Sequence, residues 1–278
     1  MHDALKYGSA PARRAQILDL LGASGAYLSQ AELSHMLGVS EMTIRRDARD
    51  LAQQGLLRVV AGGVCLIREP LADNDFRLRA QADTTLKRQL GAVALSMVAP
   101  NSTIAIDAGT TLLEMARLIG PTQTLKVVTA SLPVMTLLAD RPNVRLFGLG
   151  GELHPRTQAF AGPTTIESLR HLRVAQLFLG ASAVSGGGTY EGNTWDSEIK
   201  RAMVAAADQV VLVVDSSKFH RSAIALAVPL TAVHIAVVDD GISTGARDML
   251  EAAGVRVVVA PGSNGAMSNP ETRKDQVT

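Results

Sequence analysis

Residues 39–47 read Val-Ser-Glu-Met-Thr-Ile-Arg-Arg-Asp, and the pattern that they begin continues to Gly55. Ser40 can cap a helix here, with Glu41 placed favourably near the positive end of its dipole. The inner stripe of this helix consists of Ile44, Ala48 and Leu51, and the outer surface carries Thr43, Arg45, Arg46 and Arg49. An apolar inner face with a basic outer face is what the second helix of a helix-turn-helix presents to the major groove of DNA.

The segments on either side of this helix fit the same module. Upstream, Pro11 opens a helix that stops at Gly22, and Ser29 with Glu32 can form a capping box for a second helix that stops at Gly38. Downstream, the apolar residues around Gly62-Gly63 predict two short strands with a glycine turn between them. We therefore expect a winged helix-turn-helix over residues 11–67.

The chemistry of DNA recognition indicates which side chains of this module would contact DNA. Arginine can bind a guanine edge with two hydrogen bonds or neutralise a phosphate, and hydroxyl groups at a helix start suit backbone phosphates. The predicted DNA-binding residues are Ser40, Thr43, Arg45, Arg46, Arg49, Arg58, Gly62 and Gly63. An alternative is a solvated basic face that Asp47 and Asp50 partly neutralise. The formal net charge of +1 supports neither interpretation, whereas the flanking helices and the wing favour DNA binding.

From Asp83 onward the pattern changes to strands that alternate with helices. The run of residues 210–214 is apolar without alternation, which is typical of strands buried on both faces. Residues 83–261 are therefore predicted to form an α/β domain with a mostly parallel sheet covered on both faces. Residues 68–82 are charged and aperiodic and are predicted to be a linker, and the polar tail 262–278 is predicted to be disordered.

Polar and glycine-rich turns follow several of the predicted strands. In a parallel sheet such turns lie along one edge, where the ligands of open α/β folds bind. The segment 107–111 follows a strand and opens a helix, a geometry that suits an anion, and Lys218 adds positive charge. Together with carboxylates that can bind hydroxyl groups, this mixture matches a phosphorylated polyol. The predicted ligand-binding residues are Asp107, Gly109, Thr110, Thr111, Thr129, Ser131, Gly150, Gly151, Asp215, Ser217 and Lys218.

A structural interpretation of the same turns is also open. Glycine, serine and threonine are ordinary at strand-to-helix turns, where they cap helices, and Asp215 could cap in this way. The convergence of several turns on one edge favours a ligand. No catalytic residue, metal site or cofactor is expected.

The run from Val39 to Asp47, with Gly55, Arg58 and Gly62-Gly63 at their spacing, resembles the DeoR family of sugar-metabolism regulators over nearly the whole chain except the tail. The resemblance implies a sensor domain similar to ribose-5-phosphate isomerase that binds a phosphorylated sugar. The family's sensor motifs match Asp107, Gly109, Thr110, Thr111, Gly150, Gly151, Asp215, Ser217 and Lys218. Its later Glu and Lys match Glu198 and Lys200, for which an exposed pair on the helix surface is the alternative. The family's usual His, Asn and Asp are replaced here by Ala61, Ala130 and Gln176.

These observations predict a transcriptional repressor of carbohydrate-metabolism genes, with double-stranded operator DNA, a phosphorylated sugar and its own copies as partners in a homodimer or higher homo-oligomer. Two alternatives stay open: an activator of the same family, and a sugar-phosphate isomerase-like enzyme using Asp107, Glu198, Asp215 and Lys218 for proton transfer. The single cysteine, Cys65, and the lack of a signal-like N-terminus or a long apolar run predict a cytoplasmic protein with no membrane partner.

Overall fold

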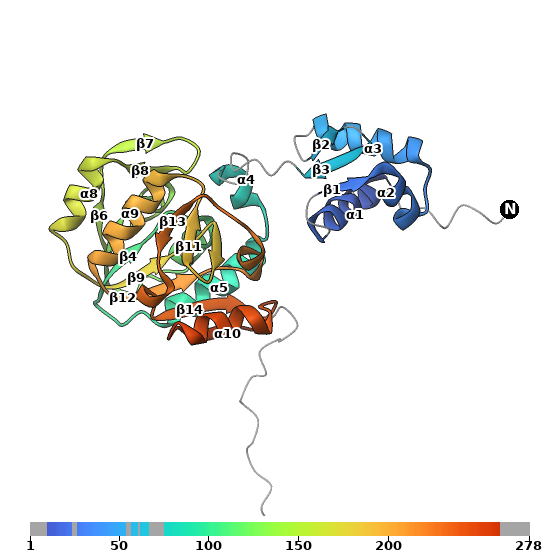
Figure 1. The fold of residues 1–278 in the computed structure, drawn as a ribbon. Coiled ribbons are helices and arrows are strands. Elements are labelled where there is room, and N and C mark those ends of the chain that lie inside the picture. The colour runs from blue at the N-terminus through green and yellow to red at the C-terminus, as the bar shows by residue number, and fades with distance from the viewer. Residues whose placement is uncertain (1–9, 24–26, 54–56, 61, 67–74, 262–278) are drawn as a thin grey trace, which may run out of the picture. The chain divides into compact units, whose positions relative to one another are not determined.

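The computed structural model describes residues 10–23, 27–53, 57–60, 62–66 and 75–261. The chain divides into two compact units, residues 1–69 and 70–278, which are called here the N-terminal unit and the C-terminal unit. Figure 1 shows both units in ribbon form. None of the described helices is long and apolar enough to cross a membrane.

The N-terminal unit combines helices with a small antiparallel sheet. Its elements are α1 (Ala10–Ala23), β1 (Tyr27–Ser29), α2 (Gln30–Leu37), α3 (Glu41–Gln53), β2 (Leu57–Val60) and β3 (Gly63–Leu66). The sheet order is β1-β3-β2, with antiparallel pairing throughout. Its core includes Ile17, Leu21, Leu33, Leu57 and Val64, together with the predicted inner stripe of α3, Ile44, Ala48 and Leu51. The predicted helix-turn-helix with a hairpin wing is confirmed.

Local signals in this unit explain where its helices begin. Ser29 Oγ accepts a hydrogen bond from the amide of Glu32, and the Glu32 carboxylate accepts one from the amide of Ser29, which is the predicted capping box. Gly38 adopts a left-handed φ of 64° that ends α2. The strand β1 was not predicted, because three residues give too little alternation to detect.

The C-terminal unit is built on a seven-stranded sheet in the order β15-β14-β12-β9-β4-β5-β6. All neighbouring pairs in it are parallel, as predicted. The strands are β4 (Thr103–Ile106), β5 (Leu125–Thr129), β6 (Val144–Gly148), β9 (Val174–Leu179), β12 (Ala207–Val213), β14 (Ile235–Asp239) and β15 (Arg256–Ala260).

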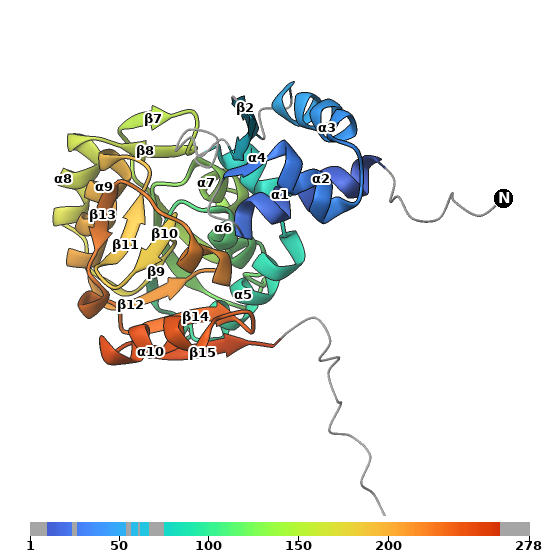
Figure 2. The same ribbon diagram turned by 45° about the vertical axis from the view of Figure 1, so that its right-hand side comes forward.

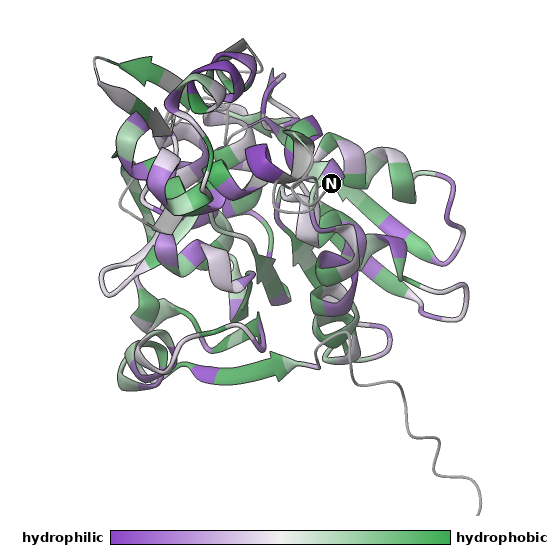
Figure 3. Cartoon of the chain, turned by 90° about the vertical axis from the view of Figure 1, so that its right-hand side faces the viewer, coloured by the Kyte–Doolittle hydropathy of each residue, from purple (hydrophilic) through white to green (hydrophobic). Residues whose placement is uncertain are grey.

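Helices cover both faces of this sheet, and each face has its own core (Figure 2). One core contains buried residues of α5 (Thr84–Ser96), α6 (Thr110–Arg117) and α7 (Leu132–Leu138). The other contains buried residues of α8 (Pro163–Arg170), α9 (Thr194–Ala205) and α10 (Thr244–Ala252). In Figure 3 the strands are largely green, whereas the helices carry hydrophilic stretches beside hydrophobic ones. Strands buried on both faces and helices buried on one explain this pattern.

Several short elements lack a signal strong enough to predict from sequence. They are the hairpin β7 (Glu152–His154) with β8 (Ala159–Ala161), the antiparallel sheet β10 (Ala183–Ser185), β11 (Gly188–Glu191) and β13 (Ala225–Val228), and the short helices η1 (Ser216–His220) and η2 (Leu230–Ala232). Helix α8 was also not predicted. Each of these strands has three or four residues, too few for periodicity to separate them from turns.

One part of the predicted linker is a helix. Helix α4 (Phe76–Gln81) lies within residues 68–82, so the linker interpretation was wrong for this segment. Asp75 caps the helix by accepting a hydrogen bond from the amide of Arg77 at 2.8 Å, and Phe76 is buried in the core shared with α5 and α6. Six residues are too short for a helical period to be visible, and a tertiary contact stabilises them instead. The predicted tail 262–278 lies outside the described residues.

Candidate DNA-binding face and ligand recess

Helix α3 presents a basic face to solvent. Arg45, Arg46 and Arg49 are exposed, while Ile44 and Ala48 of the same helix are fully buried. Ser40 caps the helix by accepting a hydrogen bond from the amide of Thr43, and the two hydroxyl groups are 2.9 Å apart. The three arginines of this helix that were predicted to contact DNA are therefore accessible to solvent.

Asp47 and Asp50 of α3 form ion pairs with another helix and not with this basic face. Asp47 is buried and accepts hydrogen bonds from Arg13 at 2.6 Å and from Arg14 at 3.1 Å, both on α1. Asp50 pairs with the same Arg14. Asp47 and Asp50 therefore pair with arginines of α1 and not with the exposed arginines of α3, and they hold α3 against α1. Among the described residues, Arg45, Arg46 and Arg49 make no ion pair.

The glycines of the wing have structural reasons to be there. Gly62 adopts a left-handed φ of 79°, and its carbonyl accepts a hydrogen bond from the amide of Gln30. A Cβ at Gly63 would lie 2.5 Å from the carbonyl oxygen of Leu28, so β1 can pair closely only with glycine at that position. The side chain of Arg58 and the residue Ala61 lie outside the described part of the chain.

The C-terminal unit contains a recess of about 250 Å³ at the carboxyl edge of its sheet. Most of the predicted ligand-binding residues line it: Asp107, Gly109, Thr110, Thr111, Lys200, Asp215, Ser217 and Lys218. Gly109 stands at the N-cap of α6 and supplies no side-chain acceptor for the first amides of that helix. A Cβ at Gly109 would meet no protein atom within 4 Å, so protein packing does not require glycine there.

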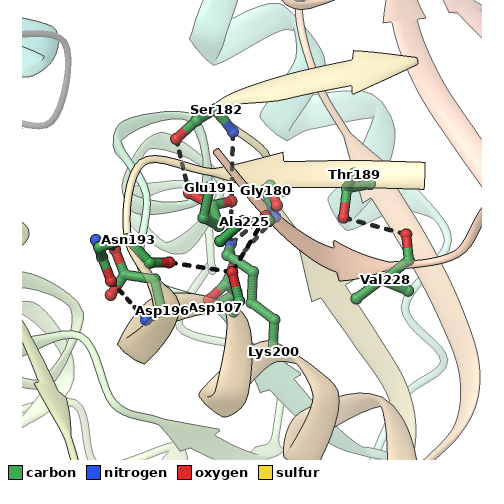
Figure 4. A network of polar contacts seen from close by, with 11 residues as sticks. Asp107, Gly180, Ser182, Thr189, Glu191, Asn193, Asp196, Lys200, Ala225 and Val228 are labelled. Atoms are coloured by element: carbon green, nitrogen blue, oxygen red, sulfur yellow. Dashed lines mark hydrogen bonds and ion pairs between the residues drawn. The ribbon is translucent and has the colours of Figure 1, made fainter. Parts of the chain in front are cut away.

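Several residues that line the recess belong to a network of buried charges (Figure 4). The ammonium of Lys200, on α9, donates to Oδ2 of Asp107 at the end of β4 and to the carbonyl of Gly180 at 2.9 Å. Its Nζ also lies 3.2 Å from Oε1 of Glu191. Ser182 donates its hydroxyl to Oε2 of Glu191 at 2.6 Å, which connects the carboxylate to the loop after β9.

Burial and pairing have opposite effects on the titration of this network. Burial opposes the charge of Lys200, but Asp107 and Glu191 outweigh it and hold the pKa of Lys200 above its usual value. Burial raises the pKa of Glu191, against the lowering effects of Lys200 and Ser182. The interpretation of Glu198 and Lys200 as an exposed pair was therefore wrong, since Lys200 is buried and binds Asp107, and only Glu198 faces solvent.

Five of the predicted ligand residues do not line the recess: Thr129, Ser131, Gly150, Gly151 and Glu198. Thr129 is fully buried and donates its hydroxyl to the carbonyl of Ile106, and Ser131 caps α7. The carbonyl of Gly150 accepts a hydrogen bond from Thr165, and a Cβ at Gly151 would collide with Thr165 and Ala161. These residues stabilise the turns. Asp215 lines the recess and also caps η1, so the ligand-binding and the capping interpretation both fit this residue.

Other residues of the recess were missed from sequence. Lys87 of α5 is buried, and its ammonium donates to the carbonyls of Arg79 and Ala82 at the end of α4. Burial lowers the pKa of Lys87. The further lining residues that were missed include Arg79, Thr157, Glu191, Asp196 and Arg221. They come from α4, the β7–β8 turn and other segments whose placement depends on tertiary contacts. These segments are far apart in the chain, so no sequence motif predicts that they line one recess.

The architecture defines a DNA-binding regulator: a winged helix-turn-helix followed by an α/β unit with a polar recess. The model of the DeoR-like helix-turn-helix domain matches residues 13–69, and that of the DeoR C-terminal sensor domain matches residues 82–240. The chain therefore belongs to the DeoR family of transcriptional regulators.

Individual relatives agree with this assignment. The chain is 33% identical to the HTH-type transcriptional regulator YgbI of Escherichia coli K12, over 90% of this chain and 98% of the relative. It is 27% identical to the transcriptional repressor AccR of Agrobacterium fabrum, over 91% and 99% of the two chains. The structure of ribose 5-phosphate isomerase A from Methanocaldococcus jannaschii aligns with half of this chain and 55% of its own, at 18% identity and a TM-score of 0.37. These last values are too low to support a shared activity.

Proposed function

We propose that this regulator is a repressor that leaves its operator when a small phosphorylated sugar binds in the recess. The observation that carries this proposal is the composition of the recess, which combines amides at the start of a helix, two threonines, and cationic side chains beside carboxylates. The amides of α6 have no side-chain cap, so they are suited to an anionic oxygen. The open space at Gly109 lets a ligand approach the backbone there.

The remaining lining residues suit the sugar part of such a ligand. Asp196 and Asp215 provide carboxylate oxygens that can accept hydrogen bonds from hydroxyl groups. Lys218 and Arg221 add positive charge, which favours a phosphorylated over an unphosphorylated polyol. Ala130 also lines the recess, at the position where the family usually has Asn. The identity of the sugar would therefore differ from that of relatives that retain the amide.

The recess serves binding rather than turnover in this proposal. Lys200, its most buried cation, is engaged by Asp107 and Glu191, and its raised pKa makes it a poor proton donor near neutral pH. The family assignment of the chain as a transcriptional regulator supports the same view. An isomerase-like activity would be revealed by turnover of ribose phosphates that Lys218→Ala abolishes.

DNA binding in this proposal involves a homodimer acting in the cytoplasm. One α3 offers few side chains for base edges, and two copies would place two such helices in successive major grooves of a near-palindromic operator. The name of the relative AccR supports repression rather than activation. Sedimentation analysis of the purified chain, with and without operator DNA, tests the dimer directly.

The decisive experiment measures DNA release. Fluorescence anisotropy with DNA from upstream of the neighbouring genes should show sequence-selective binding that weakens steeply with salt. A panel of sugar phosphates should contain one that releases the DNA, whereas the same sugar without its phosphate should not. Thr111→Val should raise the sugar phosphate concentration that is needed for release. The matched control is Thr136→Val, which alters an exposed threonine of α7 outside the recess. Release by no member of the panel would contradict the proposed effector class.

A further inference from the structure

Two polar atoms at the recess have no hydrogen-bond partner among the described residues. They are Nε of Arg79, on α4, and Oγ1 of Thr157, in the turn between β7 and β8. Both atoms are buried, and both residues line the recess. A buried donor left without a partner destabilises the folded state, so folded proteins rarely retain one without another use for it.

The two atoms belong to segments that are already joined by their backbones. The amide of Phe76, the first residue of α4, donates to the carbonyl of Arg156 at 2.7 Å, one residue before Thr157. At its other end α4 is held by the ammonium of Lys87, which binds the carbonyls of Arg79 and Ala82. The main chain and Lys87 thus place α4 against the β7–β8 turn, and neither unpaired atom is needed for that placement.

The positive charge of Arg79 favours an anionic partner. Burial is the main cause that lowers the pKa of Lys87, and Arg79 lowers it further by repulsion. Asp83 and Asp215 each act on Lys87 more strongly than Arg79 does and raise its pKa, so the net lowering reflects the removal of Lys87 from solvent. An Arg Nε can only donate, so the missing partner must offer an acceptor oxygen.

We propose that Arg79 and Thr157 are ligand-binding residues, which together hold an anionic oxygen of the effector and so connect α4 to the occupied recess. This inference rests on the proposed function and names two further residues of the same recess that would contact the effector. Helix α4 is the first described element of the C-terminal unit. An effector that binds Arg79 stabilises one arrangement of α4, and such a difference between states is what regulation by a ligand requires.

The test compares three full-length variants with the wild-type chain. Arg79→Met removes all donors of the side chain while keeping much of its length, and Thr157→Val removes the hydroxyl with little change of shape. The control is Arg77→Met, on the exposed face of the same helix and outside the recess. Isothermal titration uses the panel of sugar phosphates together with inorganic phosphate.

We expect Arg79→Met to weaken binding at least tenfold and Thr157→Val about fivefold, with Arg77→Met within twofold of wild type. Thermal unfolding without ligand separates this role from a structural one. Thr157→Val should melt at the same temperature as wild type or higher, because it removes a buried unpaired hydroxyl, yet its ligand-induced rise should be smaller. In the DNA-release assay, Arg79→Met should release less operator than wild type even at saturating effector.

The outcomes distinguish this inference from the proposed function. If wild type binds a sugar phosphate and both recess variants bind it equally well, Arg79 and Thr157 are not ligand-binding residues. If wild type binds inorganic phosphate and no sugar phosphate, the proposed effector class is contradicted. Weaker phosphate binding by Arg79→Met would then still support Arg79 and Thr157 as anion-binding residues, and unchanged binding would overturn that role. If wild type binds none of the probes, both proposals are overturned.

Discussion

The two sites of this protein use charged residues in opposite ways. On α3, Arg45, Arg46 and Arg49 are exposed and make no ion pair among the described residues. In the recess, Lys200 is buried between Asp107 and Glu191. Exposed arginines stay hydrated until DNA phosphates or bases replace the water, so they cost the unbound protein little. A buried charge persists only with its partners, so it shapes the site before any ligand arrives.

The N-terminal unit contains both kinds of charge on one helix. Asp47, next to Arg46 in sequence, is buried and pairs with Arg13 and Arg14 of α1. Neighbouring residues of α3 therefore serve different purposes, because successive positions of a helix point in different directions. This contrast separates stability from DNA affinity and can be tested one residue at a time.

The largest effect is expected from Lys200→Met. It leaves Asp107 and Glu191 buried without their cation, and breaking such a pair typically costs about 3–5 kcal/mol. Urea unfolding followed by the fluorescence of Trp195, the chain's single tryptophan and part of the C-terminal unit, measures this loss. Glu198→Gln, on the exposed side of the same helix, should change the unfolding free energy by no more than about 0.5 kcal/mol. Equal stability of the two variants would mean that Lys200 is not a structural cation.

A smaller loss is expected from Asp47→Asn. The carboxylate is buried, but Arg13 and Arg14 can turn partly toward water, so we expect a cost of about 2 kcal/mol. Hydrogen exchange of the α3 amides should accelerate, while the unfolding reported by Trp195 should stay unchanged, because that residue lies in the other unit. Unchanged exchange in α3 would show that the contact with α1 contributes little.

Arg46→Met should weaken DNA binding and leave the stability of α3 unchanged. Removing one exposed arginine should weaken operator binding by roughly 1–2 kcal/mol and lower the salt dependence of binding, with α3 exchange unchanged. Anisotropy titrations at several salt concentrations measure both quantities. An equal affinity at every salt concentration would place Arg46 outside the DNA interface.

The smallest effect concerns the pH dependence of the recess. Because the folded pKa of Glu191 is raised above its unfolded value, the folded state binds the proton more tightly. Stability should therefore fall as pH rises from about 4.5, the ordinary value, through the raised one. Glu191→Gln should flatten that decline in Trp195-monitored unfolding between pH 4.5 and neutrality. The same decline in both proteins would assign it to another group.

Much of the recess was predictable, and its gaps have a physical cause. Asp107, the Gly109–Thr111 turn and Lys218 were found because turns after parallel strands must share one edge. Thr129, Ser131, Gly150 and Gly151 satisfied the same rule but are used within the protein. A hydroxyl or glycine in a turn serves a cap and a ligand equally well, so sequence cannot assign it.

The sequence by itself determined the two-part architecture, the capping box at Ser29 and the inner stripe of α3. It also determined that the strands of the larger sheet run parallel and that helices cover both faces of that sheet. These features follow from local periodicity and capping, which act over a few residues. Only the tertiary structure decided that Asp47 binds α1, that Lys200 is buried with Asp107, and that α4 brings Arg79 to the recess. Each of these depends on contacts between residues far apart in the chain, where burial and pairing give a charge its role.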